Sequence, residues 1–122
     1  MNHLNDLFLD LYKNFNERKI DLVIAEMTGD VKWANGMDGG YVYGQNAVKE
    51  YWTRQFTLIS SKVTPLKIDS ENGAVRIKVH QVVCDLNGNL MADELVYHFF
   101  HLKDNKIIEF DIGEKLKNQD EF

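Results

Sequence analysis

The side chains best suited to proton transfer lie in two neighbouring segments of the second half of the chain. His80 lies in the segment AVRIKVHQVVCDL, and Asp93 lies in LMADELVYHFFHL. The pKa of a histidine is ordinarily about 6.5, so its imidazole can exchange a proton near neutral pH. A neighbouring carboxylate can act as a base or fix the imidazole tautomer. The alternative is structural: His80 shapes a wall through a hydrogen bond, and Asp93 pairs with Lys78 or with water.

Both segments are predicted to be strands of one hairpin, because their residues alternate with period two and Asn87-Gly88 between them is typical of a two-residue type I′ turn. This register makes His80 and Asp93 diagonal neighbours on one face. On that face the expected cross-strand pairs are Cys84 with Met91, Val82 with Asp93, His80 with Leu95, Lys78 with Tyr97 and Arg76 with Phe99. The opposite face carries Val75, Ile77, Val79, Gln81 and Val83 against Phe100, His98, Val96, Glu94 and Ala92.

The remaining segments predict the elements that must position this hairpin. Apolar residues at three- and four-residue steps predict helices over 3–16, 19–28 and 45–56, with Gly29 ending the second. Short strands are expected at 30–35 and 40–44, and long strands at 61–69, 74–86, 90–102 and 106–113. Pro65 places the 61–69 strand at an edge or a bulge. Helices followed by a meander predict an α+β fold, with helices on one face of a curved antiparallel sheet.

The segment WANGMDGGYVYG, residues 33–44, combines glycines with large side chains. It has neither the GxGxxG nor the GxxxxGK spacing of a phosphate loop, and a short strand separates most of it from the following helix. Turn chemistry at Asn35-Gly36 and at Asp38-Gly39-Gly40 explains its glycines directly. We therefore do not expect phosphate binding here.

Length and composition exclude several classes of protein. The chain has 122 residues, 44% of them hydrophobic, which predicts one packed domain over 1–122 with a polar segment, 115–122, typical of a loose tail. The net charge of -5 argues against a nucleic-acid partner. No segment is typical of a membrane span or a signal peptide, so we expect a cytoplasmic protein without a membrane partner.

The sequence offers no pattern for a metal centre. Cys84 is the one cysteine, so disulfides within the chain and zinc sites with paired cysteines are excluded, and we expect it to be a small apolar wall residue. His98 and His101 are expected on opposite faces of one strand and cannot converge on an ion. We expect neither a metal nor another cofactor.

The predicted sheet has two partly apolar faces, and both need a cover. Helices can cover one of them. We expect a second copy of the sheet to cover the other, which predicts a homodimer formed through the sheet.

Four motifs of this chain occur in the same order and with similar spacing as motifs of a known protein family. The motifs LYKNFNERKIDLVIAEM, DVKWAN, GYVYGQNAVKEYW and VYHFFHLKDNKIIEF resemble, in order and spacing, the nuclear transport factor 2-like superfamily, in its SnoaL-like branch, whose relatives include ketosteroid isomerases and polyketide cyclases. The resemblance covers nearly the whole chain. It implies a cystatin-like cone, in which the curved sheet wraps the third helix around a mostly apolar cavity. Enzymes of this family carry out acid–base chemistry in that cavity, usually without a metal or cofactor.

The catalytic positions of the related enzymes can be compared with this sequence one residue at a time. The aspartate base of ketosteroid isomerases falls at Asn35, whose amide cannot accept the proton, so steroid isomerisation is not expected. Their helix tyrosine falls at or next to Leu11, beside Tyr12, and their sheet aspartate falls at Tyr97. SnoaL-type polyketide cyclases place an aspartate and a histidine on adjacent strands, which resembles Asp93 with His80. The resemblance puts this face inside the cone, and a slip of one residue would put it outside.

We therefore expect a binding site for a small apolar or aromatic molecule, and, if the protein is an enzyme, a cofactor-free isomerase, cyclase or lyase such as a hydratase. His80, Asp93 and Tyr97 are the expected catalytic residues, although Tyr97 is equally well explained as a core residue. The expected ligand-binding residues are Trp33, Asn35, Tyr51, Trp52, Tyr12, Phe99 and Phe110, several of which core packing would also explain. The alternative is a ligand-binding or protein-interaction module without catalysis.

Overall fold

The computed structural model describes residues 3–36 and 39–113, so the tail expected at 115–122 lies outside the described residues. The helices are α1 (His3–Asn16), α2 (Ile20–Ile24) and α3 (Gln45–Gln55). The strands are β1 (Met27–Ala34), β2 (Tyr41–Tyr43), β3 (Ile59–Glu71), β4 (Ala74–Asp85), β5 (Leu90–Lys103) and β6 (Lys106–Gly113). The order of elements is the one that the sequence predicted. No helix in the described residues is long and apolar enough to cross a lipid bilayer.

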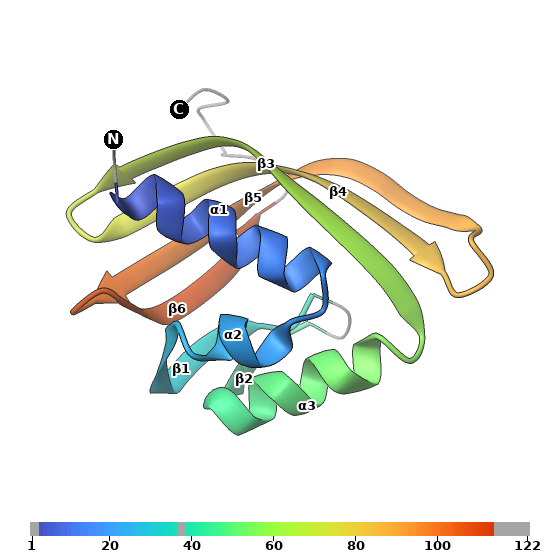
Figure 1. The fold of residues 1–122 in the computed structure, drawn as a ribbon, viewed down its shortest axis with the longest axis horizontal. Helices are drawn as coiled ribbons and strands as arrows, with labels where there is room; N and C mark the ends of the chain where they lie inside the picture. The colour runs from blue at the N-terminus through green and yellow to red at the C-terminus, as the bar shows by residue number, and fades with distance from the viewer. Residues whose placement is uncertain (1–2, 37–38, 114–122) are drawn as a thin grey trace.

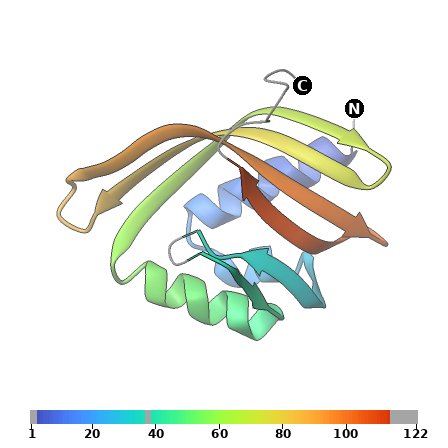
Figure 2. The same cartoon turned by 180° about the vertical axis from the view of Figure 1, so that it is seen from behind.

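The strands form one six-stranded sheet in the order β2-β1-β6-β5-β4-β3. Neighbours in it are antiparallel except β1 and β6, which run parallel. The long strands β3, β4 and β5 arch over the helices, while β1 and β2 close the opposite side beside α3 (Figure 1). Seen from behind, β5 and β6 cross in front of the helices (Figure 2). The predicted α+β fold with a curved sheet is confirmed, with one parallel pair inside a sheet expected to be antiparallel.

The second helix is shorter than predicted, and Gly29 does not end it. α2 stops at Ile24, and Met27 already belongs to β1, where it is buried. Ile107 donates its backbone N–H to the Glu26 carbonyl at 2.8 Å, so this segment pairs with β6. Long-range strand pairing therefore overrides a local helical periodicity, as is common for short apolar runs.

The turn between β4 and β5 differs from the predicted type I′ turn. Gly88 donates its N–H to the Asp85 carbonyl at 3.0 Å, and only Gly88 of the Asn87-Gly88 pair has a positive φ, of 90°. The Asp85 carboxylate accepts hydrogen bonds from the backbone N–H groups of Asn87 and Asn89, both at 2.9 Å. These hydrogen bonds, above all those from Asn89, lower the pKa of Asp85. The loop is thus one residue longer, with a left-handed glycine at its end.

A register shift between Val83 and Cys84 compensates for the longer loop. From Val83–Ala92 to Val75–Phe100 every predicted cross-strand pair is confirmed, and only Cys84 differs, since it faces Leu90 instead of Met91. The expected placement of Pro65 is also confirmed. β3 is the last strand of the sheet, and its register shifts between Pro65 and Lys67.

The face of the sheet that carries Val75, Ile77 and Val79 packs on the helices. These three residues are at most 1% exposed and belong to the same core as Phe8 of α1 and Val48 of α3. Side chains alternate along a strand, so His80 and its neighbours on the other face point away from the helices. The family alignment, which placed the His80 face inside the cone, is therefore wrong by the one-residue slip to which such an alignment is sensitive.

The C-terminal end of α1 is fixed to the edge strand β3. The Asn16 amide donates to the Val63 carbonyl at 2.7 Å, and its carbonyl oxygen accepts the Val63 N–H at 2.9 Å. One side chain thus occupies both backbone groups of an edge-strand residue, which would otherwise remain open for pairing. The clamp also fixes the position of Tyr12, one turn earlier on α1.

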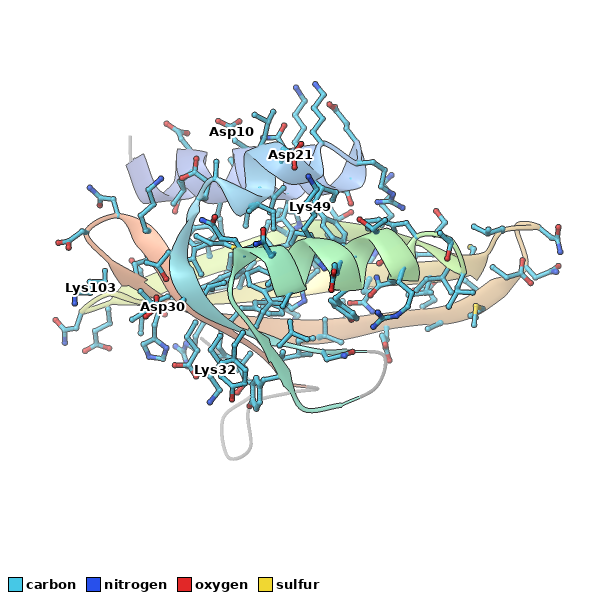
Figure 3. The ribbon with its side chains drawn as sticks, turned by 90° about the horizontal axis from the view of Figure 1, so that it is seen from below. Asp10, Asp21, Asp30, Lys32, Lys49 and Lys103 are labelled. Atoms are coloured by element: carbon cyan, nitrogen blue, oxygen red, sulfur yellow. The ribbon has the colours of Figure 1, made fainter. Side chains whose placement is uncertain are left out.

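Charged side chains occupy the periphery of the molecule. Asp10, Asp21, Asp30, Lys32, Lys49 and Lys103 all lie on the outside of the fold in Figure 3. Lys49 of α3 forms an exposed ion pair with Asp21 of α2 at 2.9 Å. Such surface pairs contribute little stability, so the fold depends mainly on its apolar core.

Candidate ligand cavity

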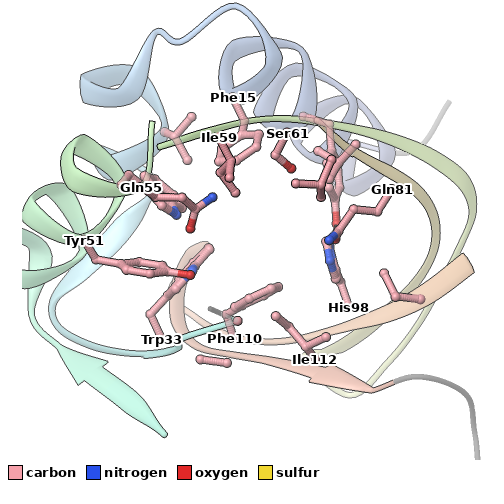
Figure 4. A pocket seen from close by; sticks show the side chains of 18 of the residues that line it. Phe15, Trp33, Tyr51, Gln55, Ile59, Ser61, Gln81, His98, Phe110 and Ile112 are labelled. Atoms are coloured by element: carbon pink, nitrogen blue, oxygen red, sulfur yellow. The ribbon is translucent and has the colours of Figure 1, made fainter. Parts of the chain in front are cut away.

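A cavity of about 540 Å³ lies between the helices and the inner face of the sheet. Its size falls in the range of about 300–1,000 Å³ that is usual for small-molecule sites. Figure 4 shows its side chains pointing into a common space, with Tyr51 and Gln55 on the side of α3 and Gln81 and His98 on the side of the long strands. The floor between them carries Trp33, Phe110 and Ile112.

Aromatic rings form much of the wall. Trp33 stacks on Phe110 with ring centroids 4.2 Å apart and meets Trp52 edge-on at 5.2 Å. Phe15 of α1 also meets Trp52 edge-on, with ring centroids 5.2 Å apart. Rings packed in this way are held by several neighbours at once and present flat, apolar surfaces. The wall therefore favours a ligand with an apolar, ring-shaped body.

The main polar feature of the cavity is a hydrogen bond between Tyr12 and His98. The Tyr12 hydroxyl and His98 Nδ1 lie 2.6 Å apart, and both residues are buried. Burial lowers the pKa of His98 to about 3 and raises the pKa of Tyr12. Both groups are therefore neutral at pH 7. If the Tyr12 hydroxyl donates to Nδ1, the proton of the neutral imidazole resides on Nε2; in the other tautomer, Nδ1–H donates to the Tyr12 oxygen.

Four further polar residues line the cavity: Gln55, Ser61, Gln81 and Glu94. Glu94 is the one carboxylate among the described lining residues, and it lies on β5 opposite Gln81 of β4. Gln55 is 8% exposed, and its Oε1 atom is buried without a hydrogen-bond partner.

His80 and Asp93 meet, but outside the cavity. His80 Nε2 lies 2.7 Å from Asp93 Oδ1, so the predicted contact exists. Their side chains are 42% and 53% exposed, and neither residue lines the cavity. Tyr97 and Phe99 share this outer face and do not line the cavity either. The predicted placement of His80, Asp93, Tyr97 and Phe99 inside the cone is therefore wrong, because the face of the hairpin that packs on the helices is the other one.

Asn35 is also outside the lining, although Ala34 and Gly36 on either side belong to it. Its backbone shapes the turn after β1: its N–H donates to the Gly40 carbonyl at 2.9 Å, and its carbonyl accepts the Gly39 N–H at 2.8 Å. The expected contact between Asn35 and a ligand is thus not supported. The other expected ligand-binding residues, which the structure brings together in the cavity wall, are Tyr12, Trp33, Tyr51, Trp52 and Phe110.

His98, Gln55 and Glu94 line the cavity but were not predicted from the sequence as site residues. His98 and Glu94 were assigned to the correct face of the hairpin, and that face carries more apolar residues than the other. This composition was the signal that could have identified the inner face. In residues 3–36 and 39–113, no group of three His, Cys, Asp or Glu side chains could hold a metal ion.

The sequence matches no protein-family model and no curated protein. Many solved structures nevertheless share its fold. One is a nuclear transport factor 2-like protein of unknown function from Burkholderia pseudomallei, with a TM-score of 0.83 and 20% identity over 94% of this chain and 92% of that one. Another is TerC, crystallised with polyporic acid, with a TM-score of 0.78 and 23% identity over 88% and 87% of the two chains.

A third is the epoxide hydrolase/cyclase-like enzyme SalBIII, which acts in pyran ring formation in the polyether salinomycin. It has a TM-score of 0.76 and 15% identity over 89% of this chain and 88% of that one. Identities this low establish the fold and leave the reaction open. The chain has the nuclear transport factor 2-like fold, the fold that its motifs predicted.

Proposed function

We propose that the cavity binds a small, largely apolar carbonyl compound and that His98 polarises its carbonyl oxygen. The observation that carries this proposal is the buried hydrogen bond of 2.6 Å between Tyr12 and His98 in the wall of an otherwise mostly aromatic cavity. In the tautomer that we propose, the Tyr12 hydroxyl donates to Nδ1, which leaves the Nε2–H of His98 to donate to a ligand. A neutral imidazole can stabilise negative charge on an oxygen by donating a hydrogen bond.

The proposed chemistry is proton transfer next to that carbonyl. Removal of a proton from the adjacent carbon yields an enolate, whose oxygen would accept the hydrogen bond from His98. His98 cannot itself be the base, since a pKa of about 3 makes it a poor proton acceptor. Glu94 is the candidate base, directly or through one water, because it supplies the carboxylate of the described lining. In a ligand with a double bond next to the enolate, return of the proton to the far carbon of the dienolate gives isomerisation. Attack of the enolate carbon on a second carbonyl gives ring closure, and the resulting alkoxide takes the proton back from Glu94.

Two of the structural neighbours support a ligand of this kind. TerC was crystallised with polyporic acid, and SalBIII acts in the formation of a pyran ring. The inner cavity that such ligands would need is present in this chain. The cavity does not contain the His80–Asp93 pair that resembles the polyketide cyclases. These two neighbours therefore support a small cyclic ligand and no particular reaction.

Hydrogen–deuterium exchange tests the proposed chemistry without knowledge of the natural substrate. We expect the protein to accelerate exchange of the α-protons of α-tetralone in D₂O, measured by NMR. His98→Phe is expected to slow this catalysed exchange by roughly a hundredfold, the usual cost of one oxyanion donor. Glu94→Gln is expected to reduce it as well. His101→Phe is the matched control, because His101 lies on the same strand but is exposed on the outer face. Catalysed exchange that persists in His98→Phe would contradict the proposal.

A carrier without catalysis is the second candidate function, and the neutral state of His98 favours it. A neutral Tyr–His pair can hold a carbonyl oxygen without moving a proton, and the remaining wall is largely apolar. Binding of α-tetralone without accelerated exchange, seen as shifts of the tryptophan indole signals, is the result expected of a carrier.

A further inference from the structure

Gln55 is a polar residue in an apolar position. The buried residues of α3 are Val48, Tyr51, Trp52 and Gln55, which form one stripe at three- and four-residue steps. At such a position a leucine or methionine would bury its side chain without cost. A glutamine there must find hydrogen-bond partners for its carboxamide or lose stability.

The carboxamide oxygen does not find such a partner among the described residues. Gln55 Oε1 is buried and unpaired, although the residue is only 8% exposed. Thr28 Oγ1 is the other unpaired buried side-chain atom of the described residues, and Thr28 does not line the cavity. Gln55 does line it, and native proteins rarely leave such a group unsatisfied unless a ligand or water completes it.

The position of Gln55 relative to His98 determines how an elongated ligand would lie in the cavity. Figure 4 shows its carboxamide and the His98 imidazole on opposite sides of the open space, with Trp33 and Phe110 on the floor between them. A ligand whose carbonyl oxygen meets His98 therefore extends its far end toward α3. A hydroxyl at that end can accept from the carboxamide amino group, or donate to the oxygen once the carboxamide has flipped, because Oε1 is buried in the orientation shown.

We propose that Gln55 is a specificity-determining residue that binds a hydroxyl group of the ligand. The ligand class is then a flat ring compound with a carbonyl at one end and a hydroxyl at the other. This inference rests on the proposed function, because the contact of the carbonyl with His98 fixes the orientation of the ligand. It adds a second polar contact that the proposed proton transfer does not require.

A pair of matched probes tests the inference. The first is an acetylnaphthol with its acetyl and hydroxyl groups at opposite ends of the ring system, and the second is the same acetylnaphthalene without the hydroxyl. Affinities are measured by isothermal titration calorimetry. Indole N–H NMR signals of Trp33 and Trp52, the two tryptophans of the chain, report entry into the cavity, which both residues line.

We expect the wild-type protein to bind the hydroxylated probe roughly ten times more tightly, because the other probe leaves the carboxamide unpaired. In Gln55→Met the preference is expected to vanish or reverse. The same variant is expected to raise the urea midpoint of unfolding, since it removes a buried unpaired group. Arg54→Met, an exposed neighbour on α3, is expected to keep the wild-type preference.

The possible failures are distinguishable. A preference for the hydroxyl that persists in Gln55→Met overturns the role of Gln55, and equal wild-type affinities do the same. If His98→Phe still weakens both probes equally in either case, the proposed function stands. If neither probe binds at its solubility limit, the ligand class inferred from both residues is wrong.

Discussion

At the scale of single residues, burial determines what the polar groups of the cavity can do. His80 and His98 are both hydrogen-bonded histidines of the same hairpin, with partners at 2.7 Å and 2.6 Å. The His80 side chain is 42% exposed beside a carboxylate, whereas His98 is buried against a phenol. Desolvation holds the second imidazole neutral, which makes it a poor base and, in the proposed tautomer, a hydrogen-bond donor to a ligand.

The low pKa of His98 predicts an acid-sensitive stability. In the folded protein the pKa is about 3, and in the unfolded chain it is about 6.5. The unfolded state therefore binds the proton first, so the contribution of His98 is complete above about pH 6.5 and is lost as the pH falls toward 3. We expect the free energy of unfolding in urea to drop by about 2 kcal/mol between pH 7.5 and pH 5.

The His98→Gln variant is the comparison for this measurement. Its amide oxygen can still accept the Tyr12 hydroxyl, but the side chain does not titrate. We expect its free energy of unfolding to vary less with pH over the same interval. Identical pH dependence in the two proteins would show that His98 does not stay neutral in the fold.

At the scale of elements, the β4–β5 hairpin decides which side chains reach the cavity. Its register was predicted correctly from Val75–Phe100 to Val83–Ala92, although the turn was assigned the wrong type. A β-bulge between Val83 and Cys84 compensates for the extra loop residue, so the pairs beyond it keep the predicted register. The register does not say which face of the hairpin points into the cone. The family resemblance placed the His80 face inside, whereas the structure places the opposite face there.

This reversal predicts that His80 is dispensable for binding. We expect His80→Ala to leave the affinity for acetylnaphthol within twofold of wild type, because the side chain lies on the outer face of the sheet. Its loss of stability is expected to stay below about 1 kcal/mol, as is usual for exposed ion pairs. A tenfold loss of affinity in His80→Ala, measured by calorimetry, would show that His80 contributes to binding.

The hairpin between β3 and β4 depends on a left-handed backbone at its turn. Gly73 has a φ of 83°, follows Asn72 with a φ of 55°, and a Cβ added to it would lie 3.4 Å from the Leu102 carbonyl oxygen. We expect Gly73→Ala to lower the free energy of unfolding by about 1–2 kcal/mol in urea denaturation. Gly29→Ala is the control. Gly29 has no positive φ and open space at its Cβ, so an equal loss there would refute this explanation.

At the scale of the whole molecule, the two ends of the curved sheet meet different helices, β3 meeting α1 and β1 with β2 meeting α3. β3 is clamped to α1 through Asn16, and β1 pairs in parallel with β6, which brings Trp33 opposite Phe110. The outer face of the long strands is left without helices in the described residues and carries exposed apolar side chains such as Leu95 and partly buried ones such as Val82.

We propose that a second copy of the chain covers this face, as the sequence suggested. Light scattering or sedimentation is expected to give twice the monomer mass at micromolar concentration, and Leu95→Lys is expected to give a monomer. Leu22→Lys is the control, since Leu22 of α2 is similarly exposed but lies away from the sheet. A monomeric mass for the wild-type protein would contradict the proposal.

The sequence by itself determined the order of the elements, the inner register of the hairpin and the fold. These follow from short-range physics: the period of the apolar residues, the turn residues and the spacing of motifs. Only the tertiary structure decided that His98 and Tyr12, 86 residues apart, share a hydrogen bond, that Met27 leaves its helix for β1, and that His80 faces outward. A face of a strand becomes an interior only when another element packs on it, and that contact joins residues far apart in the chain.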